Sequence, residues 1–175
     1  MAIDLFFGNK KDDLSAFELE ERDLEPAFYT PLGAETVGWE NDHQICWIKG
    51  YGDMIFCAQP LSADDCLVHP LARSYTDFLR LLMASGSVII LEDLYSMSRE
   101  DYQRIFAEYG YKEHREEPET QVAIEKLRRA YGIEPIEDVW GYVKEVQAGF
   151  DYTALRFPSD YYDYRGEEPP GDLRK

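Results

Sequence analysis

Two short apolar runs, at residues 44–49 and 53–58, place the strongest constraint on the fold. Both are rich in β-branched and aromatic residues, and Gly50, Tyr51 and Gly52 join them in a way that is typical of a β-hairpin. Because the runs are apolar nearly throughout, we expect the hairpin to lie at the centre of a sheet whose two faces are both covered.

Weaker strand signals flank the hairpin. Residues 66–71 form a third candidate strand, which we expect Pro70 to end. Residues 14–33 mix alternating apolar positions with charges, and Pro26 and Pro31 interrupt them. That segment is therefore predicted to hold one or two short edge strands.

A capped helix follows the third candidate strand. Ser74 is a favourable N-cap, and Asp77 three residues later resembles the second partner of a capping box. The apolar residues that follow share one helical face: Tyr75, Phe78, Leu79 and Leu82. Gly86 suits the position just beyond the last turn. We expect this helix to be buried against the sheet.

The chain after Gly86 is predicted to be mainly helical. Residues 87–97 fit either a short helix or a strand, and Ser98 caps a helix that ends before Gly110. Further helices are expected over residues 118–131 and from Pro135 onward. The predicted fold class is α+β, with an antiparallel β-sheet in the N-terminal half, helices packed on it and a helical C-terminal extension.

The length and composition are those of a single folded domain. The chain has 175 residues, of which 45% are apolar and 14% aromatic, and this excludes disorder throughout. We predict one domain over residues 1–164. Residues 165–175 lose the periodic pattern and are predicted to form a frayed acidic C-terminal tail.

The sequence carries no predicted membrane or export segment. No stretch has the length of a transmembrane helix, and the N-terminus lacks the basic start and apolar run of a signal peptide. The three cysteines, Cys46, Cys57 and Cys66, form no CxxC pair, and the first two fall in predicted strands, where a thiol is usually a small buried hydrophobic group. We therefore expect a reduced, cytoplasmic protein.

The formal net charge of −17 bears on the class of partner. Phosphate neutralisation needs clustered Lys and Arg, so the charge argues against a nucleic-acid partner and against docking on anionic lipid. A basic protein partner would be attracted by this field. High acidity also serves solubility alone, and both interpretations stay open.

No catalytic signature is present. The sequence lacks a GxGxxG loop, a Walker A loop, a GxSxG elbow and an HExxH motif. The three histidines, His43, His69 and His114, are scattered along the chain. His69 lies near Asp64, Asp65 and Cys66 and is the best metal candidate, but a second ligand pair is missing. We predict no catalytic residue, no cofactor and no metal site.

Adjacent acidic residues are abundant and include Asp12 and Asp13, Asp64 and Asp65, Glu92 and Asp93, and Glu116 and Glu117. Such pairs are expected by chance among 35 acidic residues, whereas acid–base catalysis needs carboxylates with different environments in one cleft. An enzyme whose site is assembled from His43, His69 and these acids is the alternative. A deep pocket that holds two of these groups with perturbed pKa values would favour it.

Residues 160–164 are the most partner-like patch in the sequence: Asp160, Tyr161, Tyr162, Asp163 and Tyr164. Tyrosines give a large amphipathic contact area, and the acids can pair with Arg or Lys of a partner. The same residues would also suit a terminal segment that folds back onto the domain through its rings.

The stretch from residue 39 to 86 resembles the central part of the SMI1/KNR4 family of the SUKH superfamily. The resemblance rests on the two strands with their glycine-containing turn and on the helix start that reads Ala72, Arg73, Ser74, Tyr75, Thr76, Asp77, Phe78 and Leu79, with Tyr75 where the family usually has Phe. The family implies a SUKH-like α+β fold and carries no catalytic residues. Its bacterial members are largely regarded as immunity proteins that neutralise toxins, often nucleases, and its eukaryotic relatives act as scaffolds.

We therefore expect a non-catalytic protein-binding domain whose partner is a basic protein. The resemblance implies a bacterial immunity protein that occludes the active surface of a nuclease-type toxin. Besides an enzyme with a scattered site, an oligomeric regulatory or scaffold protein is the remaining alternative, and a large self-complementary apolar patch would indicate it.

Overall fold

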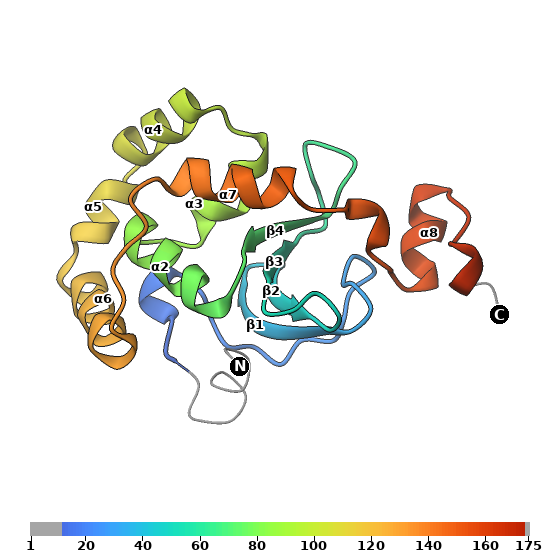
Figure 1. Cartoon of the computed structure of the whole chain (residues 1–175), viewed down its shortest axis with the longest axis horizontal. Coiled ribbons are helices and arrows are strands. Elements are labelled where there is room, and N and C mark those ends of the chain that lie inside the picture. Colours follow the sequence, from blue (N-terminus) through green and yellow to red (C-terminus); the bar gives the residue numbers. More distant parts are fainter. Residues whose placement is uncertain (1–11, 174–175) are drawn as a thin grey trace.

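The computed structural model describes residues 12–173 and contains one antiparallel sheet whose strands are paired in chain order (Figure 1). The strands are β1 (Ala34–Glu40), β2 (His43–Ile48), β3 (Ile55–Ala58) and β4 (Val68–Ala72). The predicted hairpin is formed by β2 and β3, which occupy the two central positions. All side chains of β3 are buried, as expected for a strand that is covered on both faces.

Two strand predictions were wrong. Within residues 14–33 the structure has a 3-10 helix, η1 (Ser15–Phe17), and a single bridge between Glu20 and Trp39, and the edge strand is β1 instead. Pro70 lies inside β4 and does not end it. A proline is tolerated there because β4 is an edge strand, where a missing N–H leaves no neighbouring strand unpaired.

Seven α-helices follow the sheet in the described part of the chain, and the predicted α+β class is confirmed. They are α2 (Tyr75–Ser85), α3 (Ile89–Glu92), α4 (Arg99–Glu108), α5 (Tyr111–Glu116), α6 (Pro118–Tyr131), α7 (Val139–Ala148) and α8 (Ser159–Arg165). The Ser74 hydroxyl accepts a hydrogen bond from the backbone N–H of Asp77 at 3.1 Å, and Gly86 ends α2 with a positive φ of 76°. Both ends of α2 are therefore formed by the predicted residues.

For residues 87–97, where helix and strand both stayed open, the structure has helix: α3 and the 3-10 helix η2 (Leu94–Ser96). Other helices depart from the prediction. Helix α7 begins at Val139 and not at Pro135, because the Asp138 side chain accepts the N–H of Gly141 at 3.0 Å and so provides the N-cap. Helices α5 and α8 were not predicted.

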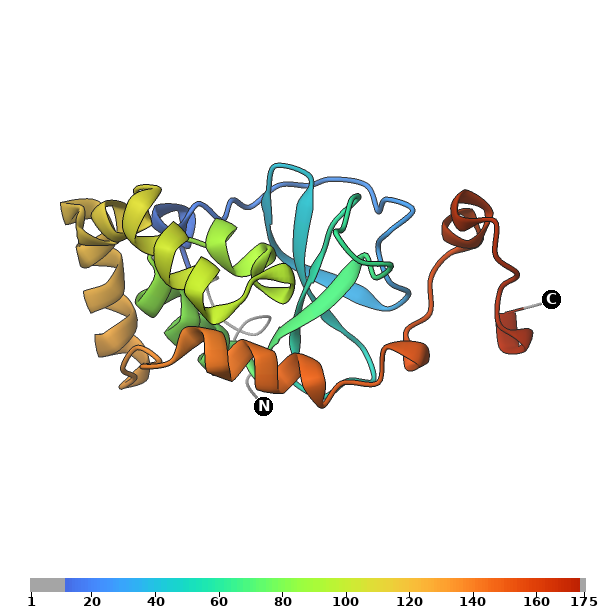
Figure 2. The same cartoon turned by 90° about the horizontal axis from the view of Figure 1, so that it is seen from above.

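The sheet separates two hydrophobic cores. Side chains of Ile45, Ile55 and Cys57 point to the face that is covered by the helices, whereas Cys46 and Phe56 point to the opposite face. The opposite face is closed by the C-terminal segment: Leu155, Phe157, Tyr161 and Tyr162. In Figure 2, α7 runs past the sheet from the helical end of the molecule towards α8 at the other end.

Candidate functional site

The residues of the predicted partner patch lie on α8, and the helix divides them between two sides. Tyr161 and Tyr162 are only 7% and 6% exposed and belong to the core of the sheet's second face. Asp160, Asp163 and Tyr164 are exposed. Because residues i, i+3 and i+4 share one helical face, these three side chains form one outward surface, which we call the α8 surface.

The buried tyrosines fix α8 on the domain. The ring of Tyr161 stacks on that of Phe157 with centroids 3.8 Å apart. The Tyr162 hydroxyl accepts the backbone N–H of Phe157 at 3.4 Å. Tyr164, although 63% exposed, has its ring centroid 4.6 Å from that of Phe28. The α8 surface is therefore held by aromatic contacts on its inner side and next to Tyr164.

The chain beyond α8 also makes specific contacts. Gly166 ends α8 with a positive φ of 66°, and η4 (Gly171–Leu173) follows. Asp172 pairs with Arg156 at 3.0 Å. Residues 174 and 175 of the predicted tail lie outside the described residues.

A loop over residues 59–67 lies beside α8, since the guanidinium of Arg165 donates to the backbone oxygen of Asp65 at 2.7 Å. The loop carries exposed Asp64 and Asp65, together with Leu61, whose side chain is 74% exposed. The contact places the loop acids Asp64 and Asp65 beside α8, which itself carries Asp160 and Asp163.

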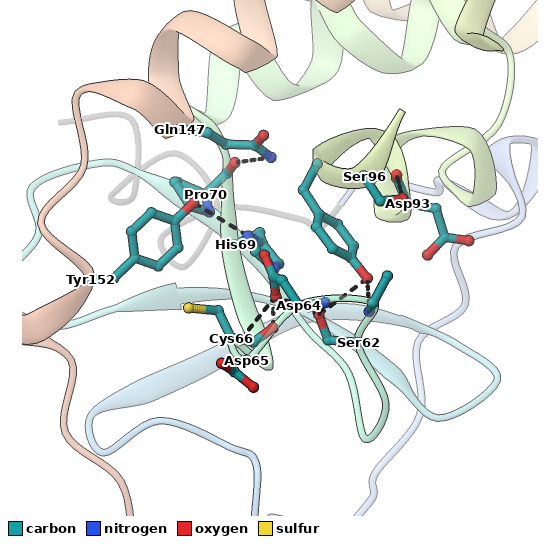
Figure 3. Close-up of polar contacts among 12 residues, drawn as sticks. Ser62, Asp64, Asp65, Cys66, His69, Pro70, Asp93, Ser96, Gln147 and Tyr152 are labelled. Atoms are coloured by element: carbon teal, nitrogen blue, oxygen red, sulfur yellow. Dashed lines mark hydrogen bonds and ion pairs between the residues drawn. The ribbon is translucent and has the colours of Figure 1, made fainter. Parts of the chain in front are cut away.

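His69 holds this loop through a closed set of hydrogen bonds (Figure 3). Its Nε2 lies 3.2 Å from an Asp64 carboxylate oxygen and 3.0 Å from the backbone oxygen of Cys66. Since both are acceptors, Nε2 carries the proton, and Nδ1 accepts the hydroxyl of Tyr152 at 3.2 Å. The imidazole also stacks on Tyr95 with centroids 3.9 Å apart.

The environment of His69 favours a structural role. Burial lowers the pKa of His69, which keeps the ring neutral. Both ring nitrogens are occupied, and in Figure 3 the Cys66 sulfur and the Asp65 carboxylate point away from the imidazole. The residues around His69 therefore form a hydrogen-bonded support for the loop and do not converge on a common metal position.

A second cluster brings together residues that the sequence places far apart. Nδ1 of His43 lies 2.6 Å from a carboxylate oxygen of Glu92, and Glu40 approaches the same nitrogen at 3.9 Å. Burial raises the pKa of Glu92 to about 7, and the hydrogen bond that the His43 ring donates to the Glu92 carboxylate raises the pKa of His43. Cys57 lies beside this pair, and burial raises the pKa of its thiol.

Sequence reasoning had named His43 and Glu92 only among scattered candidates, and it treated Cys57 as a buried hydrophobic group. The register of the sheet carries the missing signal. Cys57 pairs with Ile45, and His43 lies two residues before Ile45 on the same strand, so His43 and Cys57 share a face. The second signal is Glu92, an acidic residue that directly follows the apolar residues Ile89, Ile90 and Leu91 and is therefore expected to be drawn towards the core.

The remaining candidate residues have separate surroundings. Nε2 of His114 lies 3.2 Å from the backbone oxygen of Ala16. Asp12 accepts hydrogen bonds from the hydroxyls of Tyr75 and Tyr131, and Asp13 binds Ser15. The three histidines thus contact different sets of residues and form no shared site in the part of the chain that the structure describes.

No protein-family model, no curated protein and no solved structure matches the chain. The resemblance of residues 39–86 to the SMI1/KNR4 family therefore stays a prediction. Among residues 12–173, no helix combines the length and the apolar character that crossing a membrane requires.

Proposed function

We propose that this chain is a non-catalytic protein-binding domain that binds a basic protein through the α8 surface. The observation that carries the proposal is that the two sides of α8 differ: one is buried in the domain and the other is exposed. Two tyrosines anchor the helix inside the domain, and an exposed tyrosine flanked by two carboxylates faces outward. Tyrosine is enriched among interaction hot spots, and polar groups such as these carboxylates are typical of the rim around one.

The charge of the chain supports a basic partner. A net charge of −17 attracts cationic surfaces over a distance, and Asp64 and Asp65 add to the negative potential beside α8. Such long-range attraction raises the association rate and weakens when salt screens it. Arg or Lys side chains of the partner would pair with Asp160 and Asp163 while its apolar surface packs on Tyr164.

Toxin immunity is the specific form of this function that the family resemblance supports. In that form the partner is a nuclease-type toxin, whose phosphate-binding surface is basic. The acidic surface would cover the nucleic-acid-binding site of the toxin, so that binding by itself blocks the toxin. Three free cysteines agree with a reducing, cytoplasmic site of action in this proposal.

The test is affinity capture from the source cells with the full chain as bait, at low and at high salt. The decisive variant is Asp160→Lys/Asp163→Lys, which reverses charge on the α8 surface. Glu113→Lys/Glu116→Lys is the matched control, because it makes the same change of net charge on exposed residues of α5, at the opposite end of the molecule (Figure 1).

We expect a basic protein that is retained at low salt by the wild type and the α5 variant, released at high salt, and not retained by the α8 variant. Equal capture by all three baits would refute the assignment of the α8 surface. If the wild type captures no basic protein, the proposed function itself is wrong.

A further inference from the structure

The cluster of His43, Cys57 and Glu92 lies on the helix-covered face of the sheet, at the end of α3. His43 opens β2, Cys57 is the third residue of β3, and Glu92 is the last residue of α3. The cross-strand pairing of Ile45 with Cys57 places the His43 and Cys57 side chains on one face, and α3 brings Glu92 onto that face. Three different elements thus contribute one side chain each.

The three side chains offer a nitrogen, a sulfur and an oxygen, and these ligand atoms all lie within 4.8 Å of one another. Ligands of a tetrahedral Zn²⁺ ion are separated by roughly 3.3–3.6 Å, given the usual Zn–N, Zn–O and Zn–S bond lengths. The spacing of the cluster is therefore compatible with a shared metal ion after small side-chain adjustments. The His43–Glu92 contact of 2.6 Å would lengthen by roughly 0.7 Å to match that separation.

Glu92 supplies an independent indication that the cluster is a ligand site. Glu92 is 2% exposed, and its Oε1 atom is buried without a hydrogen-bond partner in the part of the chain that the structure describes. A buried carboxylate oxygen that accepts no hydrogen bond is costly, and buried charges in proteins are usually paired or bound to a metal. A cation between Glu92, His43 and Cys57 would satisfy that oxygen.

The surroundings favour a cation and give it a route. A carboxylate oxygen of Glu40 lies 3.9 Å from Nδ1 of His43, so Glu40 offers a further oxygen donor beside the cluster. A carboxylate oxygen of Asp42 lies 3.8 Å from Nε2 of His43 and adds negative charge on the solvent side of the cluster. Because the His43 side chain is partly exposed, an ion can reach the cluster along the edge of the imidazole.

We propose that Nδ1 of His43, Sγ of Cys57 and the carboxylate of Glu92 bind a divalent transition-metal ion, with Zn²⁺ as the preferred one. A mixed set of nitrogen, sulfur and oxygen donors suits Zn²⁺, whereas Ca²⁺ and Mg²⁺ require oxygen ligands. On binding, the Cys57 S–H bond breaks, the proton passes to solvent, and the thiolate donates to the metal. The ion would tie α3 to β2 and β3.

The test uses the full chain after treatment with a chelator and dialysis. Zn²⁺ is titrated in a calorimeter, and Co²⁺ is added in a parallel optical titration as a spectroscopic substitute. We expect one equivalent of each metal to bind. Cobalt should give a thiolate-to-metal charge-transfer band in the near ultraviolet and the strong visible bands of tetrahedral coordination.

Cys57→Ser and Glu92→Gln are the decisive variants, and Cys66→Ser is the control, since Cys66 is also a free cysteine but lies outside the cluster. Cys57→Ser should lose the charge-transfer band, and both cluster variants should bind Zn²⁺ at least tenfold more weakly. Cys66→Ser should match the wild type. A wild type without stoichiometric binding, or a charge-transfer band lost in Cys66→Ser and kept in Cys57→Ser, would overturn the proposal. The wild-type titration decides it even if a cluster variant fails to fold.

Discussion

Replacing Gly86 by alanine should destabilise the protein far more than the same change at Gly132. Both glycines end a helix in the left-handed region, Gly86 with a φ of 76° and Gly132 with a φ of 63°. An alanine in this conformation costs roughly 1–2 kcal/mol at either position. The two sites differ in their surroundings, and the difference tests the packing of α5 against α2.

At Gly86 an added Cβ would lie 2.5 Å from Cβ and 2.7 Å from Cα of Arg115, whereas at Gly132 it would meet nothing within 4 Å. Backbone cannot swing aside as a side chain can, so α5 would have to shift. Overpacking of this kind costs typically 1–3 kcal/mol. It would also disturb the hydrogen bond at 3.0 Å from Nε of Arg115 to the backbone oxygen of Met83.

We therefore expect the free energy of unfolding to fall by roughly 2–5 kcal/mol for Gly86→Ala and by roughly 1–2 kcal/mol for Gly132→Ala. Urea unfolding followed by circular dichroism measures both values under one set of conditions. An equal loss in the two variants would mean that α5 does not approach the end of α2 as closely as described.

Three further predictions concern the cores and the loop support. Phe78→Ala should lower the free energy of unfolding in urea by roughly 3–5 kcal/mol, because the ring is fully buried under the sheet; an unchanged midpoint would contradict its place in the core. Burial lowers the pKa of His69 below its ordinary value of 6.5, so the folded protein binds fewer protons there than the unfolded chain, and stability should decrease as the pH falls below 6.5. His69→Gln lacks this titration and should lose less stability over the same pH range in urea titrations; parallel curves would argue against the neutral, buried ring. Tyr161→Ala removes the stacking on Phe157 and should release α8 from the domain. Limited proteolysis would then cut the variant faster than the wild type within α8 (Ser159–Arg165). Cleavage no faster than in the wild type would show that other contacts hold the helix.

Several parts of the fold that follow from local signals were predicted correctly. The hairpin has apolar strands and a turn with two glycines, and α2 begins at the Ser74 side-chain cap and ends at Gly86, whose backbone is in the left-handed region. Pro118 at the first helical position and Gly132 just past the last one similarly delimit α6. In each case the determining contacts lie within the element itself.

Most of the features that were missed depend on distant partners, whereas the start of α7 was missed although its N-cap contact, from the N–H of Gly141 to the Asp138 side chain, is local. β1 holds Gly38 because Leu19 packs where a Cβ would stand, and the register of the strand shifts between Thr36 and Gly38, which breaks the alternation expected of an edge strand. Helix α8 is stabilised by rings of the same segment and of the sheet rather than by a periodic apolar face. These partners cannot be read from the local pattern.

The candidate sites divide in the same way. Residues 160–164 were identified by composition, but only the folded helix separates the anchoring Tyr161 and Tyr162 from the outward residues. The cluster of His43, Cys57 and Glu92 depends on strand register together with the position of α3, and neither is encoded in the spacing of the three residues.

Closure of the sheet's second face by residues from Leu155 to Tyr162 has a consequence for biosynthesis. When the ribosome has translated the strands and α2, the side chains of Cys46, Ile48 and Phe56 still lack the rings that cover them. The nascent chain therefore displays an apolar sheet face until the chain as far as Tyr162, 77 residues beyond the end of α2 at Ser85, has emerged. A chaperone that recognises exposed apolar surface has that interval in which to bind. A translation product that stops after α7 would keep this face uncovered and would be prone to aggregate.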